Sequence, residues 1–270
     1  MYGYTLIEVG LLVLAGIATG FVNVFAGGGS MFSVPALIFL GIPGPIANGT
    51  NRIAITVQTA ASVIAFKRKG FSDFALSASL SLFTLPGAII GAYSATKIRS
   101  SDFNVLLAGV MVIVMGLTFF GQKSKKAAAS ATTPAPQAGI GPEMSQALPS
   151  RARLIWGHLA MIILGFWGGF IQIGAGFILI PILHRIMGFD LLRTNVNKAM
   201  IAFLYTIVTL IVFARELEIA WAAGLFVAFG TVIGSSIAVQ SHVSKGNDFV
   251  RWMINAIFVV FIIKLLFFTR

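Results

Sequence analysis

The chain has 270 residues, of which 57% are hydrophobic and only 10% are charged, and its mean hydropathy is +0.94. A typical soluble domain carries roughly 25% charged residues, so this composition excludes a cytosolic enzyme, a nucleic-acid-binding domain and a disordered protein. The formal net charge of +11 indicates basic cytoplasmic loops of a membrane protein, and the absence of cysteine excludes disulfides and thiolate metal sites.

The first half of the chain contains apolar segments near the length of about 20 residues that a membrane-spanning helix needs. A glycine run at Gly27–Ser30 interrupts this pattern. The apolar piece that follows it, Met31–Ile42, is too short to span the membrane comfortably and is predicted to be a half-helix or re-entrant segment. Full helices are predicted over Tyr4–Ala26, Asn51–Phe66, Phe74–Thr96 and Phe103–Phe120.

The second half repeats this organisation after residues 122–151, a tract rich in Ala, Ser, Thr, Pro and Gly that is predicted to be a flexible cytoplasmic linker. A glycine break at Gly174–Gly176 is followed by a short apolar piece, Phe177–Met187. The predicted division is therefore a membrane repeat over 1–121, the linker, and a second membrane repeat over 152–270. Helices are predicted over Ala152–Ile173, Thr194–Ala214, Ala220–Gln240 and Phe249–Phe268.

The two halves align at a constant offset of 146 residues, which argues for an internal duplication. Identical or similar residues coincide at Gly28 and Gly174, Pro35 and Pro181, Asn51 and Asn197, Arg52 and Lys198, and Phe103 and Phe249. In the first half the basic loop, Lys67–Lys69, follows the third segment, whereas in the second half Lys245 and Arg251 follow the fourth. This shift predicts an inverted repeat with the N-terminus outside, and inverted repeats with broken helices are typical of secondary transporters.

The two glycine breaks are candidate anion sites. Each precedes a short helix whose first N–H groups are unpaired and whose dipole places partial positive charge at that end. Glycine also lets a ligand approach the backbone closely. The candidate substrate-binding residues at the breaks are Gly28, Gly29, Ser30, Gly174 and Gly176, with Gln172 pointing an amide into the pocket.

Two polar clusters are predicted to open membrane helices beside these breaks. Their candidate substrate-binding residues are Thr50, Asn51 and Arg52 in the first half, and Asn197 and Lys198 in the second. Cations at membrane depth are costly and usually mark ion pathways, although a cation near a helix end can instead reach the membrane surface. The repeat relates Arg52 to Lys198, which predicts that both flank one pocket about a pseudo-two-fold axis.

Acidic residues lie near predicted helix ends, in loops or in the linker, so no predicted span has a central carboxylate. A cation carrier or a carboxylate proton relay would normally need one. The spacings of His158, His184 and His242 give no metal motif. We therefore predict a pocket for a small oxyanion, with no catalytic residue, metal or cofactor.

Several stretches resemble the TauE/SafE family of sulfite and organosulfonate exporters. They run from Gly20 through Gly27–Ser30 to Pro35, over Ala47–Asn51, from Gly165 through Gly174–Gly176 to Pro181, and over Asn195–Lys198 and Tyr205–Thr206. The resemblance implies a duplicated all-helical permease that moves sulfite or a sulfonate outward across the bacterial inner membrane. The long linker departs from the family pattern.

Other functions stay open at this point. The chain could be a permease for another small anion or a metal cation, or a membrane enzyme or assembly protein without a transport role. The expected partners are a small anionic substrate and the lipid bilayer, and nucleic acid is not expected. Small-residue faces such as Gly16 and Gly20, whose spacing is typical of close helix packing, are compatible with a homodimer.

Overall fold

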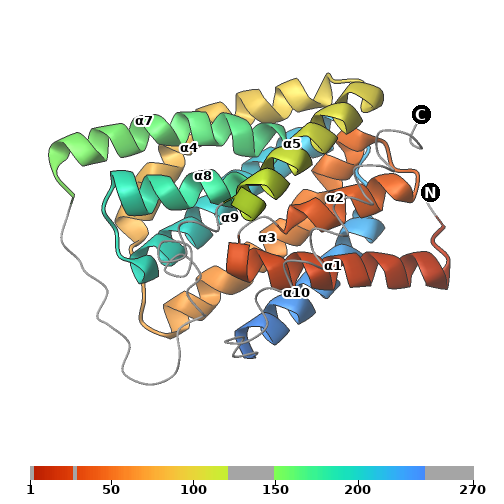
Figure 1. Ribbon diagram of the computed structural model, residues 1–270, viewed down its shortest axis with the longest axis horizontal. Helices are drawn as coiled ribbons and strands as arrows, with labels where there is room; N and C mark the ends of the chain where they lie inside the picture. Colours follow the sequence, from red (N-terminus) through yellow and green to blue (C-terminus); the bar gives the residue numbers. More distant parts are fainter. Residues whose placement is uncertain (1–2, 27–28, 121–148, 241–270) are drawn as a thin grey trace.

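The computed structural model describes residues 3–26, 29–120 and 149–240, and its helices form an elongated bundle (Figure 1). Gly28, most of the predicted linker and the predicted helix Phe249–Phe268 lie outside these residues. The described elements are α1 (Leu6–Ala26), α2 (Ser30–Phe39), α3 (Gly44–Arg68), α4 (Phe74–Thr96), α5 (Ser100–Phe120), α7 (Arg151–Phe170), α8 (Ala175–Pro181), the π-helical turn η2 (Ile182–Ile186), α9 (Leu191–Glu216) and α10 (Trp221–Gln240).

The prediction of an all-helical membrane protein is confirmed. Five of the described helices, α1, α4, α7, α9 and α10, are long and apolar enough to cross a membrane. The short apolar pieces after the glycine breaks are helical, as predicted, but α2 ends at Phe39 and α8 passes into η2 at Ile182.

The two central helices begin earlier than predicted. Helix α3 begins at Gly44 rather than Asn51, because Pro45 lies in the first turn, where its missing N–H leaves no hydrogen bond unmade. Helix α9 begins at Leu191 rather than Thr194, because the Asp190 side chain accepts a hydrogen bond from the Arg193 N–H at 2.7 Å. The two polar clusters, Asn48–Arg52 and Arg193–Lys198, therefore lie in the first turns of their helices rather than at the first residues.

Glycines set the closest contacts of the bundle. Helix α1 packs along α10, and a Cβ atom at Gly16 would overlap the backbone carbonyl of Val227. Helix α4 packs along α7 in the same way, with Gly87 against the carbonyl of Ile162. These small-residue faces therefore pack helices of the same chain against one another. They do not support a homodimer, which stays a prediction.

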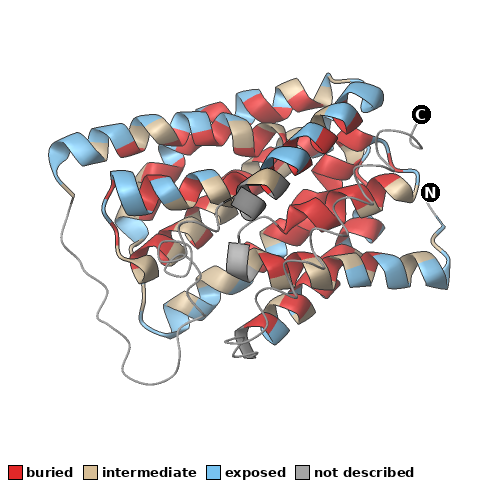
Figure 2. Cartoon of the chain, viewed as in Figure 1, coloured by how far each residue is buried: buried red, intermediate tan, exposed pale blue. Residues whose placement is uncertain are grey.

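Helices α3 and α9 run in opposite directions through the middle of the bundle. Arg52 and Gly49, early in α3, lie against Phe213, late in α9. Conversely Asn197, early in α9, bonds to Asp73 in the short connection after α3. Buried residues concentrate along the inner helices, whereas the flanking helices are exposed on their outer sides (Figure 2). The inverted repeat stays a prediction, which the opposite directions of these equivalent helices support.

Candidate functional site

The described residues of the first break are Gly29 and Ser30, at the start of α2. Gly29 is the N-cap of α2 and packs so closely on α1 that a Cβ atom there would overlap the Thr19 carbonyl. Ser30 begins α2 and is 5% exposed. Helix α2 is buried along most of its length, so its N-terminal end faces protein rather than lipid.

The second break turns the chain sharply between α7 and α8. Gln172 and Gly174 have left-handed backbone conformations, with φ of 55° and 74°. Gly174 tolerates this conformation because it lacks a Cβ atom, whereas the same conformation is uncommon for glutamine. The Gln172 amide donates to Thr206 Oγ1 of α9 at 2.8 Å, and Gly176 lies in the first turn of α8.

One turn of α3, Asn48–Arg52, lies between the two broken segments. On one side Asn51 accepts a hydrogen bond from Ser33 of α2, with the Oγ and Oδ1 atoms 2.5 Å apart. On the other side Asn48 donates to the carbonyl oxygen of Phe170, the last residue of α7, at 2.8 Å. Thr50 reaches a third element and accepts from the N–H of Ala220 at 3.2 Å, immediately before α10. This turn therefore ties both breaks to the centre of the bundle.

Arg52 is fully buried and all of its recorded partners are neutral. Its guanidinium donates to the carbonyls of Gly168 and Gly169 in the last turn of α7, and to Thr209 Oγ1 at 2.6 Å. It also lies over the Phe213 ring, 4.6 Å from the centroid. The expected alternative, a cation that reaches the membrane surface, does not apply to Arg52.

The C-terminal end of α7 compensates only part of the Arg52 charge. A helix end carries the equivalent of roughly half a negative charge, whereas the guanidinium carries a full positive charge. A residual positive potential therefore remains at the crossing of α3, α7 and α9. Membrane proteins rarely retain such a charge at depth without a function.

Two donors on the Asn48–Arg52 turn have no partner among the described residues. They are Arg52 Nε and Asn51 Nδ2, and both atoms are buried. The acceptors Asn48 Oδ1 and Gln172 Oε1 are in the same condition. Unmade hydrogen bonds of buried groups cost about 1–3 kcal/mol each, so buried donors beside a cation favour an oxyanion as a ligand.

The second polar cluster lies elsewhere. Asn197 accepts from Ser77 Oγ at 2.8 Å and donates to Asp73 Oδ2 at 3.0 Å. Asp73 in turn forms an ion pair with Arg193, with Nε and Oδ2 2.6 Å apart. Lys198 is half-buried, and nothing in the described part of the chain is recorded as its hydrogen-bond or ion-pair partner. Along α9 it lies about 16 Å from Thr209, so the structure does not bring Lys198 to Arg52.

Several residues of the Arg52 environment were not singled out from the sequence. Ser33 bonds to Asn51, Thr209 bonds to Arg52, and Thr206 bonds to Gln172. Thr206 and Thr209 are spaced like neighbours on one helix face, within an otherwise apolar span. That spacing is the signal that could have identified them.

The chain matches one protein family and several curated membrane transporter proteins. The family described as "Sulfite exporter TauE/SafE" matches residues 12–265. A probable membrane transporter protein ORF9 of Sinorhizobium sp is 22% identical over 94% of this chain and 91% of its own length. A probable membrane transporter protein of Haemophilus influenzae is 23% identical over 90% of this chain and 89% of its own length. The probable membrane transporter protein YfcA of Escherichia coli K12 is 24% identical over 96% of this chain and 89% of its own length. No solved structure matches the chain.

Proposed function

We propose that this chain, which belongs to the sulfite exporter TauE/SafE family, is a secondary transporter that exports a small sulfur oxyanion, sulfite or an organosulfonate. The relatives named above are probable membrane transporter proteins, which supports membrane transport as the general function. The membrane would be the bacterial inner membrane, with the N-terminus outside and the linker in the cytoplasm.

The observation that carries this proposal is the environment of Arg52. A fully buried guanidinium is surrounded by carbonyl oxygens, a hydroxyl and an aromatic ring, so its charge is only partly compensated. Its Nε atom and Asn51 Nδ2 are unpaired donors on the same turn of α3. A tetrahedral or pyramidal oxyanion would supply both the missing charge and the missing acceptors.

Substrate binding would begin at these donors. Arg52 Nε and Asn51 Nδ2 would each donate to a substrate oxygen, and the N-terminal end of α2, at Gly29 and Ser30, would add a favourable dipole. Lys198 would not take part in this first contact, because it lies further along α9. It stays a candidate for another point of the substrate path.

Alternating access would follow from a rocking motion of the two halves about the crossing of α3 and α9. This step depends on the predicted inverted repeat, which the opposite directions of α3 and α9 support. A negative-inside membrane potential favours the exit of an anion by about 2.3 kcal/mol per charge at 100 mV. The potential alone is therefore sufficient to drive export of a charged substrate.

The direct test is sulfite flux in proteoliposomes under an imposed membrane potential. Hydrogen bonds to charged groups contribute about 1.5–3 kcal/mol, so Arg52→Gln should lower flux about 10- to 100-fold. Arg52→Lys should retain part of the flux, because it keeps the charge but loses the planar donor geometry.

Arg99→Gln is the matched control. Arg99 is an exposed arginine paired with Asp102 outside the site, so its loss should leave flux unchanged. Flux that is equal in Arg52→Gln and Arg99→Gln would refute the proposed role of Arg52. Absence of flux for sulfite and sulfonates in the unmodified protein would refute the proposed substrate class.

A further inference from the structure

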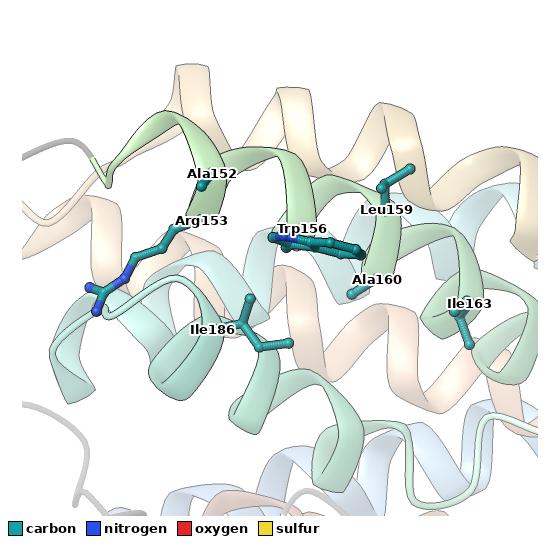
Figure 3. Close-up of a pocket in the computed structure, with 7 residues that line it drawn as sticks. All are labelled: Ala152, Arg153, Trp156, Leu159, Ala160, Ile163 and Ile186. Carbon is teal, nitrogen blue, oxygen red and sulfur yellow. The ribbon is translucent and has the colours of Figure 1, made fainter.

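An apolar groove of about 420 Å³ lies on the outer surface of the bundle, between α7 and η2 (Figure 3). Trp156, Leu159 and Ile163 line it from α7, and Ile186 faces them from η2. Trp156 is 65% exposed and Ile163 is 73% exposed. These side chains make the groove hydrophobic, and a membrane would cover this surface with lipid.

The groove has a cation at one end. Arg153 lines it there (Figure 3), and its guanidinium lies so close to Gly188 that a Cβ atom added to this glycine would be 2.5 Å from Nη1. The described part of the chain gives this guanidinium no carboxylate partner, although Ser150 accepts from the Arg153 backbone N–H. Arg151 and Arg185 are two further exposed cations, adjacent in sequence to the groove residues.

This combination distinguishes the groove from the rest of the lipid-facing surface. A long apolar channel suits an alkyl chain, and a cation at its end suits a phosphate group. Trp156 lies one turn from Arg153, and tryptophan is enriched at the depth of lipid headgroups. The α7 end that carries these arginines is the end for which the sequence predicts a cytoplasmic location, where anionic lipids concentrate.

We propose that the groove between α7 and η2 binds one anionic phospholipid, with its phosphate on Arg153 and an acyl chain along Trp156, Leu159 and Ile163. The lipid contacts α7 and η2 together, and these two elements lie before and after the segment formed by the second break and α8. It would therefore hold the broken segment against α7. This binding does not depend on the identity of the transported substrate.

Tryptophan quenching tests the proposal in the full chain reconstituted in bilayers. Brominated phosphatidylglycerol and brominated phosphatidylcholine are the probes, and the difference between the unmodified protein and Trp156→Phe gives the share of Trp156. One basic side chain near the surface contributes about 1 kcal/mol for anionic lipid, so phosphatidylglycerol should bind about fivefold more strongly than phosphatidylcholine.

Matched variants separate headgroup recognition from general lipid contact. Arg153→Gln should abolish the preference and Arg153→Lys should retain most of it, and neither change removes a recorded side-chain hydrogen bond. Trp221→Phe should leave the preference intact, because Trp221 is an exposed tryptophan at the start of α10, outside the groove.

Two results would overturn the proposal. Equal quenching of Trp156 by both lipids would show that the groove does not recognise a headgroup. Absence of quenching by either lipid would show that protein covers the groove, either residues 241–270 of this chain or a second copy.

Discussion

The two central helices each bury an arginine, and the two arginines differ in how their charge is compensated. Arg52 of α3 lies 4.6 Å from the ring centroid of Phe213, and Arg193 of α9 lies 4.6 Å from that of Phe189. Arg193 also forms an ion pair with Asp73 at 2.6 Å. Arg52 instead bonds to the carbonyls of Gly168 and Gly169 and to a hydroxyl.

This difference separates a structural cation from a candidate binding cation. A buried charge that is paired and hydrogen-bonded is neutralised within the protein, and its loss is a matter of stability. A buried charge with neutral partners keeps an electrostatic potential that an anion can use. The Arg193 region, with Asp73, Asn197 and Ser77, therefore fastens α9 to the start of α4, whereas the Arg52 region can receive a substrate.

The largest effect on transport is expected from giving Arg52 a carboxylate partner like that of Arg193. Thr209 Oγ1 lies 2.6 Å from the Arg52 guanidinium, so Thr209→Asp would place a carboxylate there. Loss of one hydrogen bond between the substrate and a charged group should lower anion flux in proteoliposomes about 10- to 100-fold. Thr209→Asn is the control of similar shape without charge, and its flux should stay close to normal. Equal flux in the two variants would contradict the account.

The next effect concerns the stability of the Arg193 region. Asp73→Asn removes the carboxylate that is ion-paired with the buried Arg193, and breaking such a pair costs about 3–5 kcal/mol. The double variant Asp73→Asn with Arg193→Gln should recover most of this loss, because both charges are gone. Thermal unfolding of the purified protein measures both changes. A double variant less stable than Asp73→Asn would show that the pair is not what fastens these helices.

A smaller effect on stability is expected from replacing Asn48. Asn48→Ala removes the bond to the Phe170 carbonyl but leaves the two Arg52 contacts with α7 in place. The expected loss of stability is about 1 kcal/mol. Asn195→Ala is the control, because the hydrogen bond that Asn195 makes among the described residues lies within its own helix, to the Leu191 carbonyl at 3.0 Å. If both variants unfold at the same temperature, Asn48 does not hold the second break.

The smallest effect is expected from the exposed ion pair between Lys97 and Glu216. Hydrogen bonding to Glu216 raises the pKa of Lys97, so the Lys97 ammonium is charged at neutral pH. The contribution of the pair would be lost only as pH rises through that raised pKa. Lys97→Ala should change neither flux nor unfolding temperature measurably at neutral pH, because exposed pairs contribute little. A clear change in either would mean that this connection takes part in the transport cycle.

Much of the helical framework could be predicted from the sequence, because membrane helices have a strong apolar signal. Helix α4 has the predicted bounds, Phe74–Thr96. Short helices follow the two glycine breaks, with Gly29 and Gly174 as their N-cap residues. The predicted start of α3 at Asn51 is too late, because proline in a first turn favours a helix start and Pro45 lies in the first turn of α3.

The site was predicted only in part, because its decisive contacts join residues far apart in the chain. Arg52 was singled out, but its partners Gly168, Gly169 and Thr209 lie more than a hundred residues away. The sequence repeat predicted equivalent roles for Asn51 and Asn197. In the structure Asn51 is hydrogen-bonded to a serine of α2, whereas Asn197 is hydrogen-bonded to Asp73. The two sites differ because the repeat places no acidic or hydroxyl residue at the positions equivalent to Asp73 and Ser77.

The central claim is that an oxyanion binds at Arg52 and Asn51, and anomalous diffraction from crystals soaked in selenite tests it most directly. Selenite has the shape and charge of sulfite, and its selenium atom can be located without ambiguity. The account predicts a selenium peak close enough for the oxygens to accept from Arg52 Nε and Asn51 Nδ2, and its loss in Thr209→Asp. A peak beside Arg193 instead, or no peak at Arg52 at concentrations that saturate transport, would contradict it.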